Sequence, residues 1–142
     1  MPVAAARPHT DAVVSMGTSA GLLIGRGKPP EGAGWQGEPG ASTFEAYVAL
    51  FPMTGDVDAD LGDPAHYFDY GCQFTCVAAT QEGAEAVSDA IKATFVNAKL
   101  IIPGRASYRG QLQVDRPASR DDRTAPPLHY AVLQITWRTQ PA

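Results

Sequence analysis

The fold is decided by residues 67–97, which read YFDYGCQFTCVAA followed by TQEGAEAVSDAIKATFVN. In the first part, large apolar residues alternate with polar or small ones, as in a strand with one buried face. In the second part, Val87, Ile91 and Phe95 recur at helical spacing, and Thr80 is a typical helix N-cap. The sequence therefore predicts a long strand over 67–79 that runs directly into a helix over 81–97.

The inner face of this strand is predicted to consist of Phe68, Tyr70, Cys72, Phe74 and Cys76. The two cysteines would stand roughly 13 Å apart, at about 3.3 Å per residue along a strand. A disulfide needs Cα atoms within about 7 Å, so these two residues are too far apart to be bridged. The same distance excludes joint ligation of one metal ion unless the strand bulges. We expect two buried free thiols that act as small hydrophobic side chains.

The chain has the size and composition of one globular domain. It has 142 residues, of which 44% are hydrophobic. No apolar run approaches the roughly 18 residues needed to cross a membrane, and the first residues lack the apolar core of a signal peptide. We therefore expect synthesis in the cytoplasm and no membrane partner.

Charge is unevenly distributed along the chain. The net charge is −4, but residues 1–98 hold 12 of the 15 acids and only 4 of the 11 Lys and Arg residues. The remaining residues are net basic. Such a chain could associate with copies of itself, acidic surface against basic surface. The alternative is that folding intermixes the two signs.

The remaining elements point to an antiparallel sheet. The predicted helices and strands span residues 10–26, 43–51, 67–79, 81–97, 99–102, 108–114 and 128–138. Strands that follow one another directly favour hairpins. We predict a two-layer α+β domain, with a mostly antiparallel sheet, both helices on one face, a β-hairpin and long loops. The other face of the two longest strands is polar but weakly charged, which suits a protein contact as well as it suits water.

The segments between these elements are long. Residues 1–9 are predicted to form a flexible arm, and residues 27–42 form a loop rich in Gly and Pro. Residues 52–64 are predicted as an acidic turn region, and 115–127 as a second long polar loop. Loops of this length are usually functional or partly mobile.

Two motifs that could bind small ligands fail on spacing. The run Gly25-Arg-Gly-Lys28 hints at a phosphate loop, but Leu22 stands where glycine is required and Pro29 where Ser or Thr must follow the lysine. Residues 56–60 have the one-three-five acid spacing of a calcium loop, yet Leu61 replaces the required glycine and Tyr67 the closing glutamate. We expect no cofactor and no metal, and an acidic solvated loop at 56–60.

Catalytic residues are equally scarce. His66 and His129 could approach each other across the sheet, but a metal site would need a third ligand that the sequence does not suggest. Cys72 and Cys76 lack an adjacent base, and no Gly-Xaa-Ser-Xaa-Gly motif occurs. The loose arginine tract over 105–123 lacks the aromatic platforms typical of nucleic-acid binding. We expect a protein that is not an enzyme.

Several segments resemble the tail terminator proteins of long-tailed, siphovirus-type bacteriophages of actinobacteria. The strongest match is residues 74–89, where a strand enters a helix with closely similar spacing. Residues 8–13 resemble the opening of the family's first helix, and residues 45–52 resemble its first strand and turn. Residues 127–137 resemble its final strand. The likeness covers most of the chain in matching order, apart from 27–42, which has the character of an insertion.

The resemblance implies a ring-forming virion protein, typically a hexamer with an α+β subunit. Such a ring sits on the head-proximal end of the tail tube, ends tube polymerisation and joins the tail to the head-completion, or stopper, proteins. The implied partners are further copies of the chain, the major tail tube protein and the stopper protein, with genomic DNA only passing through the lumen. The implied location is the neck region of the virion, reached after assembly in the host cytoplasm.

Surfaces that could make these contacts are the sheet edges, the predicted hairpin and the long loops. The candidate interface residues are Tyr108, Arg109, Gln111, Gln113, Arg116, Arg120, Arg123, Asp56, Asp58 and Asp60. Two alternatives stay open: another neck or tail-completion protein, and a small ligand-binding domain. A deep pocket lined by Tyr70, Cys72 and Tyr130 would favour the ligand-binding domain.

Overall fold

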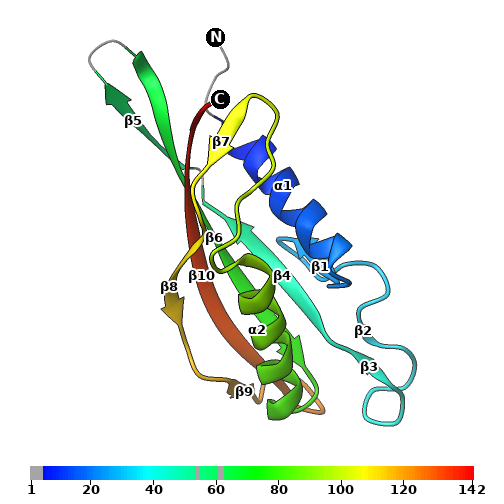
Figure 1. Ribbon diagram of the computed structural model, residues 1–142. Coiled ribbons are helices and arrows are strands. Elements are labelled where there is room, and N and C mark those ends of the chain that lie inside the picture. The colour runs from blue at the N-terminus through cyan, green and yellow to red at the C-terminus, as the bar shows by residue number, and fades with distance from the viewer. Residues whose placement is uncertain (1–4, 54, 61–62) are drawn as a thin grey trace.

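The computed structural model describes residues 5–53, 55–60 and 63–142 of the chain (Figure 1). Two helices and ten strands occur in these residues. In chain order they are α1 (Ala6–Ser19), β1 (Ile24–Arg26), β2 (Gly34–Trp35), β3 (Phe44–Glu45), β4 (Tyr47–Pro52), β5 (Asp56–Asp60), β6 (Asp63–Ala78), α2 (Gln81–Phe95), β7 (Arg105–Ser107), β8 (Gln111–Asp115), β9 (Ser119–Asp121) and β10 (Leu128–Pro141).

Strands β6 and β10 form the centre of the main sheet. They run antiparallel, with register pairs from His129 opposite Ala78 to Thr139 opposite Phe68. Strand β4 pairs with the other side of β6, and β1 adds to β4 as a parallel strand. Strands β7, β8 and β9 each pair with β10. The small strands β2 and β3 form a separate hairpin sheet.

Both helices lie on one face of this sheet (Figure 1). The face beneath them carries the alternate residues that the sequence predicted: Phe68, Tyr70, Cys72, Phe74 and Cys76 of β6 are each at most 2% exposed. Strand β10 contributes the buried residues Ala131, Leu133, Ile135 and Trp137. The predicted α+β class is thus confirmed, with two helices over a mostly antiparallel sheet.

Helix α2 begins where the sequence predicted. The hydroxyl of Thr80 accepts a hydrogen bond from the backbone N–H of Gly83 at 3.0 Å, which caps the first turn. The helix ends at Phe95, two residues before the predicted end. Asn97 follows with a positive φ of 64°, a conformation that Asn tolerates better than most residues and that cannot continue a right-handed helix.

Helix α1 differs from its prediction at both ends. It begins at Ala6, so part of the predicted flexible arm is helical, and His9 and Thr10 are buried. Pro8 is compatible with this start because the first turn does not use its missing N–H. The helix ends at Ser19, and the positive φ of Gly21 turns the chain back into β1, in a segment predicted as helix.

The predicted loops contain strands. Most of the predicted turn region 52–64 belongs to β5 and to the start of β6, which pair as an antiparallel hairpin. Strands β2 and β3 close the loop 27–42. Strand β9 interrupts the loop 115–127, and the strand predicted at 108–114 is replaced by β7 and β8. Among the described residues, no helix is long and apolar enough to cross a membrane.

Candidate functional site

The sheet face opposite the helices is open. Its central part is a groove of about 430 Å³ between β4 and the turn that leads into β10. Tyr47, Gln73, Tyr130 and Val132 line its floor, and Arg123 lies at its rim. The groove is wide and mixes apolar, uncharged polar and charged side chains, which suits a protein surface better than a small ligand.

An ion pair joins the two central strands on this open face. Arg138 donates to both carboxylate oxygens of Asp69, from Nε at 2.7 Å and Nη2 at 2.9 Å, and these residues are register partners. The guanidinium group also lies 4.7 Å from the centre of the Tyr67 ring. The hydrogen bond from Arg138 lowers the pKa of the Asp69 carboxyl. This arrangement stabilises the pairing of β6 with β10 where the helices give no cover.

The predicted hairpin residues lie beside this pair, on the side of β10 that faces away from β6. Tyr108, Arg109 and Gln111 line a pocket of about 230 Å³ together with Asp69 and Arg138. The Arg109 guanidinium donates to the backbone carbonyl of Asn97 at 3.0 Å. The structure thus brings together three residues of the candidate interface.

The edge strand β8 carries the next candidates. Gln113 donates to the Thr136 hydroxyl of β10 at 3.1 Å and is exposed. Asp115, at the end of β8, forms a 2.8 Å ion pair with Lys92 of α2. Arg116 follows it and is exposed, and its backbone N–H donates to the carbonyl of Val132. Most of the β8 surface is therefore available for contacts.

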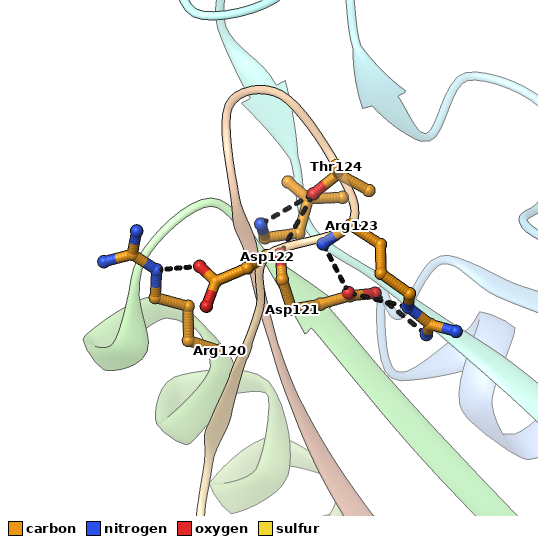
Figure 2. Close-up of polar contacts among 6 residues, drawn as sticks. Arg120, Asp121, Asp122, Arg123 and Thr124 are labelled. Atoms are coloured by element: carbon orange, nitrogen blue, oxygen red, sulfur yellow. Dashed lines mark hydrogen bonds and ion pairs between the residues drawn. The ribbon is translucent and has the colours of Figure 1, made fainter.

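Arg120 and Arg123 have partners of their own in a tight turn (Figure 2). Arg120 forms an ion pair with Asp122 at 2.5 Å, and Arg123 contacts both carboxylate oxygens of Asp121. The Asp121 carboxylate also accepts the backbone N–H of Arg123 at 3.0 Å. These hydrogen bonds from Arg123 lower the pKa of Asp121. The turn is therefore close to charge-neutral, which the sequence count of arginines did not reveal.

The acidic candidates are separate from the basic ones. Asp56, Asp58 and Asp60 all belong to β5, at the opposite edge of the sheet, and their side chains lie outside the described part of the structure. The structure thus divides the predicted residues into an acidic strand and a basic edge. It does not bring them together within one copy of the chain.

Burial makes the cysteines unreactive. Both are free and fully buried, as predicted. Burial raises the pKa of Cys76 to about 12 and raises that of Cys72 further. The thiolate is the nucleophilic form, so neither side chain is suited to nucleophilic chemistry near neutral pH.

His66 and His129, which could have approached each other across the sheet, lie far apart along it. His129 lies opposite Ala78, at the far end of β6 from residue 66, because the two strands are antiparallel. The side chain of His66 lies outside the described residues. In the described part of the chain, no group of three or more His, Cys, Asp and Glu side chains could hold a metal ion.

His9 takes part in a buried polar network that the sequence did not predict. Its Nδ1–H donates to the carbonyl of Ala5 at 2.7 Å, and its Nε2 lies 2.7 Å from the hydroxyl of Thr139. The same hydroxyl accepts from Nε of Arg105 at 3.0 Å. Burial lowers the pKa of His9, and the nearby Arg105 charge lowers it further, against the opposite effect of Ala5. The network fixes α1 to β7 and β10, with a neutral imidazole at its centre.

The pocket that would favour a ligand-binding domain does not form. Tyr70 and Cys72 lie on the helix-covered face and are at most 1% exposed, whereas Tyr130 lies on the opposite face of the sheet. A second groove, of about 510 Å³, lies between α2 and strand β4. Its lining is apolar, with Glu45 as its charged member, so it lacks the converging polar groups of a ligand site.

This fold is also found in solved structures, of which two are compared with the chain. A chain in the virion of a native gene transfer agent particle matches with a TM-score of 0.53 and 18% sequence identity, over 96% of this chain and 92% of that chain. A second solved structure, described without a function, matches with a TM-score of 0.53 and 14% identity, over 96% of both chains. No protein-family model and no curated protein sequence matches the chain significantly. At these identities the likeness shows a common fold.

Proposed function

We propose that the chain is a structural, non-enzymatic protein of a phage-like virion. The observation that carries this proposal is the fold: nearly the whole chain superposes on nearly the whole of a chain in a gene transfer agent virion. The buried thiols, the missing ligand pocket and the open sheet face support it, because an assembly protein needs surfaces for contact rather than a reactive site.

Within the virion, we propose the role of tail terminator. In this role the chain forms a ring, a hexamer by the resemblance of its sequence, on the head-proximal end of the tail tube. The ring ends tube growth and presents its other side to the stopper protein. Genomic DNA passes through the lumen, where the net charge of −4 disfavours tight binding to phosphates. The specific alternative is another protein of the neck, such as a head-closure component.

Tube capping tests this role directly. Purified chain is added to polymerising tail-tube protein, and tube lengths are measured by electron microscopy. We expect short tubes of uniform length with a ring at one end. Tubes that keep lengthening without a cap would contradict the terminator role, while binding to a stopper or portal ring alone would favour the neck alternative.

The arginine turn offers a second test. Replacing Arg120 and Arg123 by Glu removes the ion pairs with Asp122 and Asp121 and places four carboxylates in one turn. If this turn contacts the tube or the stopper protein, capping is lost while the thermal unfolding of the subunit changes little. Undiminished capping by the double variant would show that the turn lies outside the interface.

A further inference from the structure

The two lateral edges of the main sheet differ in their ability to accept another strand. At one edge, β1 has only three residues and is followed by Pro29 and Pro30, which have no N–H to donate. The chain also turns back against β1: a Cβ on Gly25 would lie 2.0 Å from the carbonyl oxygen of Lys28. Short length and proline are typical ways to protect a sheet edge from pairing.

The opposite edge is open at β8. This strand has five residues without proline, none of them is buried, and in the described part of the chain it pairs only with β10. Arg109 and Arg116 flank it, and neither has a carboxylate partner among the described residues, in contrast to the arginines of the 120–124 turn. Asp115 is already paired with Lys92. The available charge beside this edge is therefore positive.

A second open edge has the opposite charge. Strand β5 pairs only with β6 in the described residues, and Val57, its second residue, is 52% exposed. The β5–β6 hairpin extends beyond the two helices (Figure 1). Residues 53–66 contain four aspartates and no Lys or Arg. Both β5 and β8 have five residues, and they lie on opposite sides of the central β6–β10 pair.

We propose that copies of this chain associate head to tail, with β5 of one copy pairing with β8 of the next. This rests on the proposed ring and identifies the surfaces that close it. Pairing β8 with β8 would bring the flanking arginines of two copies together. Pairing β5 with β5 would bring together the aspartate-rich strands of two copies. Like charges disfavour both symmetric pairings, whereas β5 against β8 is complementary. An open head-to-tail assembly then always has one free β5 edge and one free β8 edge, which pair with each other when the ring closes.

Cysteine cross-linking tests the pairing. The native thiols are buried, so disulfides between copies can form only through the introduced cysteines. We expect that Val57→Cys combined with Gln113→Cys gives disulfide-linked multimers under oxidising conditions, both in concentrated protein and on tail tubes. Variants with Gln111→Cys in place of Gln113→Cys cover a shifted register. Dimers formed by Val57→Cys alone or by Gln113→Cys alone would overturn the proposal, because they report the symmetric pairings.

Charge reversal gives an independent test. Asp56→Lys with Asp58→Lys reverses β5, and Arg109→Glu with Arg116→Glu reverses the flanks of β8. Each double variant alone is expected to associate at least about tenfold more weakly than the unmodified chain. An equimolar mixture of the two restores association, because each reversed edge then meets a complementary one. Native mass spectrometry measures both effects, and a mixture that stays as weak as its components overturns the proposal.

Matched controls keep the same charge changes on other surfaces. Glu31→Lys with Glu38→Lys in the loop around β2, and Arg26→Glu with Lys28→Glu at the β1 edge, alter exposed residues of segments that lie apart from β5 and β8 (Figure 1) and are expected to leave association unchanged. If the unmodified chain caps tubes but neither test detects β5 against β8, the edge pairing fails and the proposed function stands. If the cross-link forms while tubes keep lengthening, the terminator role fails and the pairing stands.

Discussion

Acidification is predicted to weaken the attachment of α1 to the sheet through His9. The ring is fully buried, and both of its nitrogens have partners in the neutral state. A second proton, on Nε2, would remove the acceptor of the Thr139 O–H, whose oxygen also accepts from Arg105. Protonation would also place a positive charge near the guanidinium group of Arg105, so the folded protein resists protonation of His9.

The size and direction of the effect follow from proton linkage. The pKa of His9 is lowered from 6.5 on folding, chiefly by burial. Above this value neither state binds the proton; below it the unfolded chain binds a proton that the folded protein does not. The free energy of unfolding therefore falls as pH decreases. If the His9 imidazole stays neutral in the folded protein, the loss is at most about 1.4 kcal/mol between pH 7.5 and 5.5. The stabilisation from Asp69, whose pKa is lowered from 3.8 by Arg138, is lost only at lower pH.

Urea unfolding at pH 7.5, 6.5 and 5.5 measures this dependence. The unmodified chain should lose stability across the series, whereas His9→Gln should start lower, by about 1–3 kcal/mol for the disturbed hydrogen bonds, and then change less with pH. His129→Gln is the matched control, because it leaves the His9 network in place. Equal pH dependence in the unmodified chain and in His9→Gln would refute the reasoning.

Three further predictions concern packing and capping, each measured by urea unfolding. Phe74→Ala removes a fully buried aromatic ring, whose centre lies 5.0 Å from that of Phe95, and should cost about 3–5 kcal/mol of stability. The control is Ile101→Ala, at an 85% exposed residue, which should change stability by less than about 0.5 kcal/mol. Gly110→Ala should cost about 1–3 kcal/mol, because its Cβ would meet the Phe95 carbonyl oxygen at 2.5 Å. Thr80→Ala should cost about 0.5–2 kcal/mol by leaving the N-terminus of α2 uncapped, and Thr80→Ser should retain most of that stability. Losses at Phe74 or Gly110 no larger than at Ile101 would contradict the packing described.

The central strands and α2 were predictable because their signals are local. Alternation in β6 and β10 assigns each side chain to a face without knowledge of the partner strand. Thr80 marks the start of α2 for the same reason. The polar character of the open face followed directly from the residues between those of the core.

The start of α1 and the strand β5 were not predictable in the same way. Thr10 has the character of an N-cap, yet its hydroxyl lies 2.7 Å from that of Tyr70, a contact between residues 60 positions apart. His9 depends on Thr139, which is 130 positions away. Strand β5 is rich in aspartate, a residue that disfavours strands, and it forms because β6 extends far enough to pair with it.

The same dependence on distance limits the interface prediction. The sequence identified the basic and acidic residues, but it could not show that Arg120 and Arg123 are paired within their own turn. Nor could it show that β5 and β8 lie at opposite edges of the sheet. Which charges remain available to a partner depends on the folded arrangement.

The position of β10 has a consequence for biosynthesis. This strand comes after all the others in the chain, yet it lies at the centre of the sheet, between β6 and the edge strands β7, β8 and β9. While the ribosome is still adding residues 128–141, one side of β6 has no partner and the apolar face under α2 is only half built. Folding of the domain must therefore wait for residues 128–141, and a nascent chain that stalls before them would expose a pairing-competent strand to its neighbours on the same polysome.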